Sequence, residues 1–301
     1  MNRNYWSREI GRFDPDRDYH RIYQILVAHE FPWDFNQSLS FALFRTYAVP
    51  SIGRLLYKTG EFTERTQKRV DDTELILDAI LEHGIKSAPG RTAVRRMNQM
   101  HRSYSISNDD MRYVLATFVV VPVRWLEDFG WRALIAAERA AISNYYRDLG
   151  QHMNIKDIPA NYDEFAPFMD RYEREHFRYD PDARAVSDAT LDLMTTFPPN
   201  HRAWRALIRW FALSVMDTPL LETFGYRIPS LLERAVSRGV LRLRRRVVRH
   251  MPPRIKPLFA RDMHILSYPG GFEIAQLGTF PRGGCPVAHT GDGTDGEDGW
   301  A

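Results

Sequence analysis

The chain has little of several features on which common protein classes depend. It has one cysteine, Cys285, so no disulfide can form within the chain, which fits a reducing compartment. Its most apolar stretch, Val114–Val123, is interrupted by Thr117 and Pro122 and is far shorter than the roughly 20 residues that span a bilayer. The charged N-terminal residues lack the apolar core of a secretory signal. We therefore expect a cytoplasmic protein with no signal peptide and no transmembrane helix.

Other classes are disfavoured by missing motifs and by the charge balance. The sequence has no P-loop, no G-x-S-x-G nucleophile motif and no H-E-x-x-H zinc motif. The formal net charge is only +3, which argues against a nucleic-acid binder with a dominant positive field. We expect no nucleic-acid partner.

Hydrophobic and charged residues make up 44% and 26% of the chain, as in ordinary globular proteins. Nearly every periodic segment has helical spacing, and alternating runs of β-branched residues are scarce. We predict an all-α fold with one helical domain over residues 1–280 and a disordered Gly- and Asp-rich tail over residues 281–301. The nearest strand candidate, Tyr113–Val123, could equally be a buried helix. Predicted helices include Asp18–Ala28, Leu39–Val49, Thr66–His83, Gly90–Tyr104, Asn108–Val121, Pro122–Phe129, Leu134–Met153, Tyr162–Phe177, Arg184–Thr196, Arg202–Val215 and Ser230–His250.

One predicted helix carries a histidine on its apolar side. Met97 and Val94 precede His101 by four and seven residues, and Tyr104 follows it by three. This spacing turns the imidazole toward the protein interior, where it needs a hydrogen-bond acceptor, a carboxylate or a metal. A core histidine with a satisfied hydrogen bond, a general base and a metal ligand all remain open on these residues alone.

Two groups of polar residues are candidates for the same site. Arg69 and Thr73 lie four residues apart, so on a helix a guanidinium and a hydroxyl share one face and suit a carboxylate or a polarised oxygen species. Arg95, Arg96 and Asn98 precede His101, and at least one of them could reach over the same pocket. Solvated helix faces are the alternative interpretation of both groups.

A third segment, Arg234–Lys256, is densely basic. Val236, Val240, Leu243 and Val247 recur in it at helical spacing, so one stripe is apolar. The segment is typical of an amphipathic helix at an anionic membrane surface, or of a helix packed on the body of the protein with its arginines in water. The predicted tail contains Cys285 before Pro286, with His289 four residues after the cysteine, which suggests a thiolate ligand or simply an inert tail.

Three stretches of the chain resemble a known family. TGEFTERTQKRVDDT, GRTAVRRMNQMHRSYSISNDDMRYVLATFVVVPVRWLEDFGWR and ERAAISNYYRDLGQHMNIKDIP are similar to the MpaB-like and rubber-oxygenase (latex-clearing protein) catalytic family. The resemblance extends from about Phe41 to Gly278, and a YPGG segment at Tyr268–Gly271 fits the same group.

The resemblance implies an all-helical fold that holds one haem b, and cleavage of isoprenoid C=C bonds with dioxygen. It makes His101 the iron ligand and matches Arg69 and Thr73 to the R-x-x-x-T pair near the haem. We accordingly expect a haem b-dependent oxygenase or oxidase that acts with dioxygen on a lipophilic, isoprenoid-like small molecule. Arg95, Arg96 and Asn98 would position the haem or tune the histidine.

The sequence also departs from that pattern. Asp72 stands where latex-clearing proteins have a lysine that can cap the iron. The glutamate assigned as a base in those enzymes would fall near Gly53, and Ser105 and Ile106 replace basic and histidine residues after the ligand. Two other functions therefore stay open: a non-catalytic haem-binding or sensing protein, and a membrane-peripheral interaction protein that uses Arg234–Lys256 and no cofactor.

Overall fold

The computed structural model describes residues 2–197, 200–262 and 265–279, and these residues form thirteen α-helices and no strand. The predicted all-α fold class is therefore confirmed. The helices are α1 (Tyr5–Ile10), α2 (Tyr19–Ile25), α3 (Pro32–Tyr47), α4 (Pro50–Thr59), α5 (Thr66–His83), α6 (Ala88–Arg102), α7 (Asn108–Phe129), α8 (Ala136–His152), α9 (Tyr162–His176), α10 (Pro181–Met194), α11 (Arg205–Val215), α12 (Thr218–Phe224) and α13 (Leu231–Arg249). A π-helical turn, η1 (Leu26–Glu30), continues α2, and short 3₁₀ turns lie at η2 (Asn200–Arg202), η3 (Ala260–Asp262) and η4 (Ile274–Gln276).

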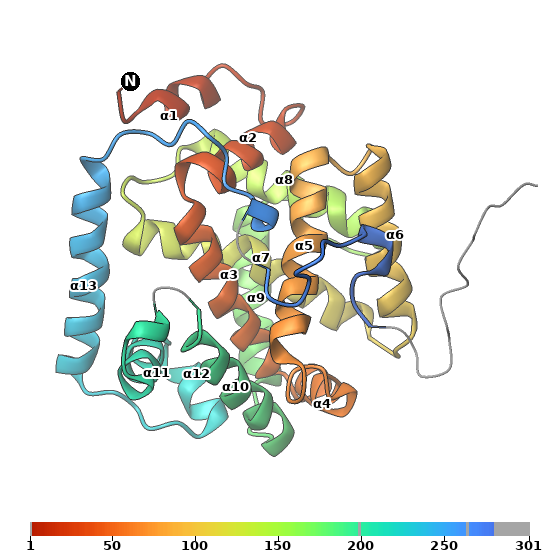
Figure 1. Ribbon diagram of the computed structural model, residues 1–301, viewed down its shortest axis with the longest axis vertical. Coiled ribbons are helices and arrows are strands. Elements are labelled where there is room, and N and C mark those ends of the chain that lie inside the picture. Colours follow the sequence, from red (N-terminus) through yellow and green to blue (C-terminus); the bar gives the residue numbers. More distant parts are fainter. Residues whose placement is uncertain (1, 198–199, 263–264, 280–301) are drawn as a thin grey trace, which may run out of the picture.

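Helix α7 is the centre of the core. It packs against α3, α8 and α9, and Figure 1 shows it surrounded by other helices. Tyr113, Val119 and Val123 are completely buried on it. The stretch that could have been a strand is thus a buried helix, which is why its apolar residues show no alternation with polar ones.

The predicted helix boundary at Pro122 is wrong, because α7 passes through this proline without ending. Proline removes one backbone hydrogen bond and normally ends or kinks a helix. Here Val119 and Val120 before it, and Val123 after it, are all fully buried. Packing on both sides of Pro122 outweighs the lost hydrogen bond.

The N-terminal part of α3 was not predicted. The helix begins at Pro32, seven residues before the expected start, with Asp34 in its first turn. A proline at the first helical position followed by an acidic residue is a recognised start signal, because proline needs no hydrogen bond there and the carboxylate faces the positive end of the helix dipole.

Two peripheral elements matter for function. The segment 265–279 runs across α5 toward α6, where η4 packs (Figure 1). Helix α13 stands at the outer edge of the molecule and contacts α11 and α7 (Figure 1). The predicted tail, with Cys285, Pro286 and His289, lies outside the described residues.

Candidate functional site

Helices α5 and α6 form a hairpin that brings His101 to Arg69. Arg69 lies near the start of α5 and His101 near the end of α6, so the two ends meet when the helices lie side by side (Figure 1). The turn between them depends on two glycines. Gly84 has a φ of +79°, and a Cβ on Gly90 would lie 2.0 Å from the Gly84 carbonyl oxygen. Only glycines permit so tight a connection.

The His101 imidazole is mostly enclosed and electrically neutral. Burial and the positive charge of Arg69 lower its pKa to about 4, although the Met97 carbonyl one turn earlier acts in the opposite direction. Its Nδ1 atom is buried and makes no hydrogen bond of ordinary geometry within the described part of the chain. A neutral imidazole with an unsatisfied nitrogen is the form that binds metals. The role of His101 as a metal ligand stays a prediction.

Arg69 and Thr73 share a face of α5, as their spacing indicated. The Arg69 guanidinium donates a hydrogen bond to the Thr73 hydroxyl, which in turn donates to the Arg69 carbonyl at 2.8 Å. The guanidinium also lies 5.2 Å from the centre of the Phe62 ring. Burial lowers the pKa of Arg69, and within the described ranges no carboxylate comes within ion-pair distance of it. A buried guanidinium without a carboxylate partner can accept an anionic ligand group.

A residue that the sequence did not suggest faces the same place. The Tyr47 ring, at the end of α3, is completely buried, and its hydroxyl has no hydrogen bond of ordinary geometry among the described residues. The ionised Tyr47 hydroxyl would be attracted electrostatically to the Arg69 guanidinium, so these two side chains lie near each other. No local pattern could have indicated Tyr47, because its neighbourhood depends on how α3 packs in the tertiary fold.

Asp72 takes part in a polar cluster on the same helix. It is buried, its carboxylate lies 2.7 Å from the Lys68 ammonium, and it accepts a hydrogen bond from the Tyr268 hydroxyl. Lys68 also donates to the Tyr268 oxygen at 2.9 Å. The YPGG segment is thus attached to α5 through the residue that replaces a lysine in the resembling family.

Arg96 binds the C-terminal segment. Its side chain is buried and donates to the carbonyl oxygens of Leu277 at 2.5 Å and Thr279 at 2.7 Å, and to the Gln99 side chain at 2.9 Å. Arg95 is exposed, and it donates a 3.3 Å hydrogen bond to the Thr92 hydroxyl. The role of both arginines in positioning a cofactor stays a prediction.

Asn98, His152 and His176 make other contacts. Asn98 donates to the His152 carbonyl at 2.9 Å and so joins α6 to the end of α8. The His152 and His176 rings each have a backbone acceptor one turn earlier, at 2.8 and 2.9 Å. Gly53 is packed so closely that a Cβ would lie 2.5 Å from the Ala183 Cβ, so this position holds a helix contact and no base.

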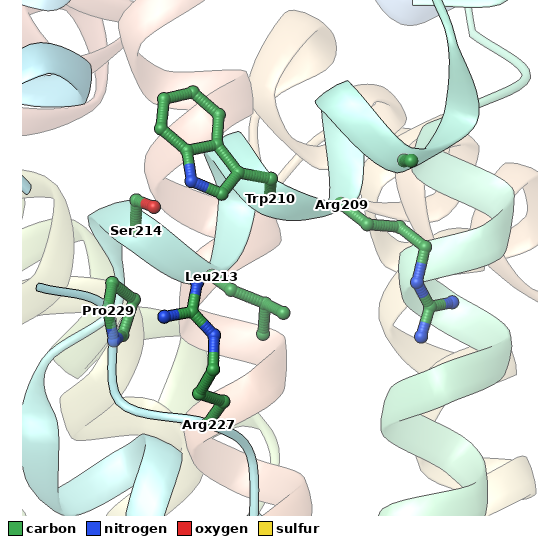
Figure 2. A pocket seen from close by; sticks show the side chains of 7 residues that line it. Arg209, Trp210, Leu213, Ser214, Arg227 and Pro229 are labelled. Carbon is green, nitrogen blue, oxygen red and sulfur yellow. The ribbon is translucent and has the colours of Figure 1, made fainter. Parts of the chain in front are cut away.

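A separate hollow of about 330 Å³ lies between α11 and the chain that leads into α13. Figure 2 shows Trp210, Leu213 and Ser214 of α11 facing Arg227 and Pro229. The Arg227 guanidinium is paired with Glu233, and no lining residue comes from α5 or α6. The hollow is therefore distinct from the His101 site.

Two negative findings apply to the described ranges. No cluster of three or more His, Cys, Asp or Glu side chains there could hold a metal ion. No described helix is both long enough and apolar enough to cross a membrane.

The chain is similar to a family of oxygenases. The family model described as ER-bound oxygenase mpaB/B'/Rubber oxygenase, catalytic domain, matches residues 35–250. ER-bound oxygenase mpaB' of Penicillium brevicompactum is 32% identical over 266 residues, which are 82% of this chain and 62% of that protein. ER-bound oxygenase mpaB of the same species and that of Penicillium roqueforti (strain FM164) are each 36% identical over 155 residues, half of this chain and 40% and 52% of those proteins. This chain thus spans less than two thirds of each relative. It belongs to the ER-bound oxygenase mpaB/B'/rubber oxygenase catalytic-domain family.

Proposed function

We propose that the protein is a haem b-dependent oxygenase that acts with dioxygen on a lipophilic, isoprenoid-like small molecule. The observation that carries the proposal is the neutral His101 with its unsatisfied Nδ1, beside an Arg69 that lacks a carboxylate partner. Family membership supports oxygenase activity in general. Haem dependence, the substrate and C=C cleavage are our extension of it.

Features of His101 and Arg69 support the proposal of a haem. A single histidine is sufficient for it, because the porphyrin supplies four nitrogen ligands and the protein needs only to provide an axial one. The Met97 carbonyl, one turn before His101, interacts with the imidazole and would help to orient it, as acceptors commonly do for ligating histidines. Haem also carries two propionates. A propionate is a carboxylate, and Arg69 has no carboxylate partner among the described residues.

Each group of the site has a separate task in this proposal. His101 binds the iron, and Arg69 with Thr73 binds a propionate or orients a polar oxygen atom on the substrate side. Arg96 secures the segment that covers α5 and α6. When bound, haem b supplies the redox-active iron at which dioxygen is activated. Phe62 and Tyr47 contribute aromatic surface that excludes water from the reacting groups.

The names of the relatives support the substrate class and the location that we propose. The family includes rubber oxygenases, and rubber is a polyisoprene, so an isoprenoid-like chain is the substrate class we propose. Asp72 is engaged by Lys68 and Tyr268, so we expect the far side of the iron to differ from that of enzymes with a capping lysine. The relatives are described as ER-bound, and we propose a cytoplasmic, membrane-peripheral location for this chain.

The visible spectrum of the full chain tests the cofactor. The chain is expressed with ample haem precursor, alongside His101→Ala and the control His152→Ala. We expect a Soret band in the wild type and the control and its loss in His101→Ala. Colourless wild-type protein would overturn the haem assignment, and a band retained in His101→Ala would move the ligand elsewhere. Haem binding without consumption of dioxygen in the presence of isoprenoid alkenes would instead establish the non-catalytic alternative.

A further inference from the structure

Helix α13 exposes a continuous apolar stripe on the surface of the protein. Val236, Val240, Leu243 and Val247 are 47%, 53%, 61% and 56% exposed. At 100° per residue these four side chains lie within about 60° of one another on the helix. We call them the α13 stripe. Such large apolar side chains in a row on an outer helix normally mark a binding surface.

The stripe does not face the protein. Ser237 and Leu241 are the buried residues of α13, and Arg244 turns inward to pair with Asp34 at 2.9 Å and to lie over the Trp33 ring at 3.6 Å. Ser237, Leu241 and Arg244 thus lie on a different side of the helix from the stripe. Packing of α13 on the body of the protein therefore accounts for the face that carries Ser237 and Leu241. The α13 stripe has no partner in the described structure.

Two arginines, Arg242 and Arg246, lie beside the stripe on the side away from the protein body, about 130° and 90° from its centre at 100° per residue, whereas Arg245 and Arg249 lie nearly opposite the stripe. Arg242, Arg245, Arg246 and Arg249 make no hydrogen bond or ion pair with any described residue, whereas Arg238 and Arg244 have acidic partners on α7 and α3. Unpaired positive charge next to an apolar stripe complements an anionic surface with an apolar interior. A second copy of the chain would bring the same unpaired arginines together, which disfavours self-association through this face.

We propose that α13 is a lipid-docking helix that lies in the headgroup region of an anionic bilayer. The α13 stripe enters the acyl boundary, and Arg242 and Arg246 contact lipid phosphates and carboxylates. Exposed Leu232 and Met251 extend the apolar surface at the two ends of the helix. Helix α13 would be the surface that contacts the membrane in the peripheral location proposed above, and this role does not depend on haem.

The test measures co-sedimentation of the full chain with vesicles of 70% phosphatidylcholine and 30% phosphatidylserine. We compare the wild type with Leu243→Asn/Val247→Asn and with Arg242→Gln/Arg246→Gln. The control Arg171→Gln/Arg178→Gln removes the same charge from exposed positions outside α13. We expect each α13 pair to weaken binding about tenfold, the control to change it less than twofold, and wild-type binding to fall as salt rises.

Wild-type protein that stays in the supernatant, or α13 pairs that bind like the control, would overturn the proposal. A concentration-dependent dimer that Leu243→Asn/Val247→Asn abolishes, without vesicle binding, would assign the stripe to a second copy instead. Circular dichroism checks that each variant stays folded, and the Soret band reports the haem site independently, so the two proposals fail separately.

Discussion

The Tyr268 hydroxyl donates a hydrogen bond to the Asp72 carboxylate, which lies 196 residues earlier in the chain. Lys68 contacts both groups and the Gly278 carbonyl, at 2.7, 2.9 and 3.5 Å. The hydrogen bonds to Asp72 and Tyr268 raise the pKa of Lys68 despite the opposing effect of burial. The C-terminal segment is thus held to α5 by a charged cluster that contains Lys68 and Asp72, and Asp72 directly precedes Thr73.

Replacing Asp72 tests the contribution of this cluster to stability. Asp72→Asn keeps the size of the side chain but leaves the Lys68 ammonium without a carboxylate. We expect the free energy of unfolding in urea to fall by about 2 kcal/mol, because a partly buried charge loses its partner. Glu175→Gln, at an exposed position, serves as the control and should change stability by about 0.5 kcal/mol or less. Equal stabilities of the two variants would contradict the account.

Replacing Arg96 tests how the segment 265–279 is held. Arg96→Met removes donors to the carbonyls of Leu277 and Thr279 but keeps an apolar side chain of similar length. We expect limited proteolysis to cleave this segment severalfold faster, because local opening becomes easier. Arg95→Met, at the exposed neighbouring position, should leave the cleavage rate unchanged. The same rate in both variants would show that other contacts hold the segment.

A buried ion pair joins α3 to α9. Arg45 donates to the Glu173 carboxylate through two nitrogens, and Tyr113 donates to the same carboxylate at 3.1 Å. We expect Glu173→Gln to lower the free energy of unfolding by about 2 kcal/mol, because Arg45 loses its more buried partner and keeps only the partly exposed Asp217, at 2.6 Å. The matched control is Asp170→Asn, which removes the partner of the half-exposed Arg124 and should cost about 1 kcal/mol or less. If thermal or urea unfolding shows that both variants lose a similar free energy of unfolding, the predicted difference between the two ion pairs is refuted.

The low pKa of His101 predicts a pH dependence of stability in the haem-free chain. The folded state keeps the imidazole neutral down to pH about 4, whereas an unfolded histidine takes up its proton near pH 6.5. The unfolded state therefore binds more protons in this range, so stability falls as pH decreases from 6.5 to 4, by at most about 1.4 kcal/mol per pH unit. His101→Gln should lack this component. Parallel stability–pH curves for the two proteins would contradict a buried neutral imidazole.

Local patterns predicted those elements whose signals lie within a few residues. Helix α5 begins and ends at Thr66 and His83, as its apolar spacing indicated. The Arg69–Thr73 contact is likewise a local, one-turn relationship. The passage of α7 through Pro122 could not be predicted in this way, because it depends on packing against α3, α8 and α9.

The surroundings of the site depend on long-range contacts and were correspondingly harder to predict. The carbonyl partners of Arg96 lie more than 180 residues away in the sequence, and the position of Tyr47 depends on α3. A single sequence contains no local signal for either. The inward direction of His101, in contrast, follows from Val94 and Met97 on the same helix, and its proximity to Arg69 follows from the short turn between α5 and α6.

The central claim is that His101 binds the iron of a haem, and ligand replacement tests it most directly. In His101→Gly the imidazole side chain is removed, and free imidazole is then titrated into the haem-supplied protein while the absorption spectrum is recorded. We predict that the wild-type Soret band is lost or shifted in the variant and that imidazole restores it. A variant whose spectrum equals that of the wild type before any imidazole is added would contradict the assignment.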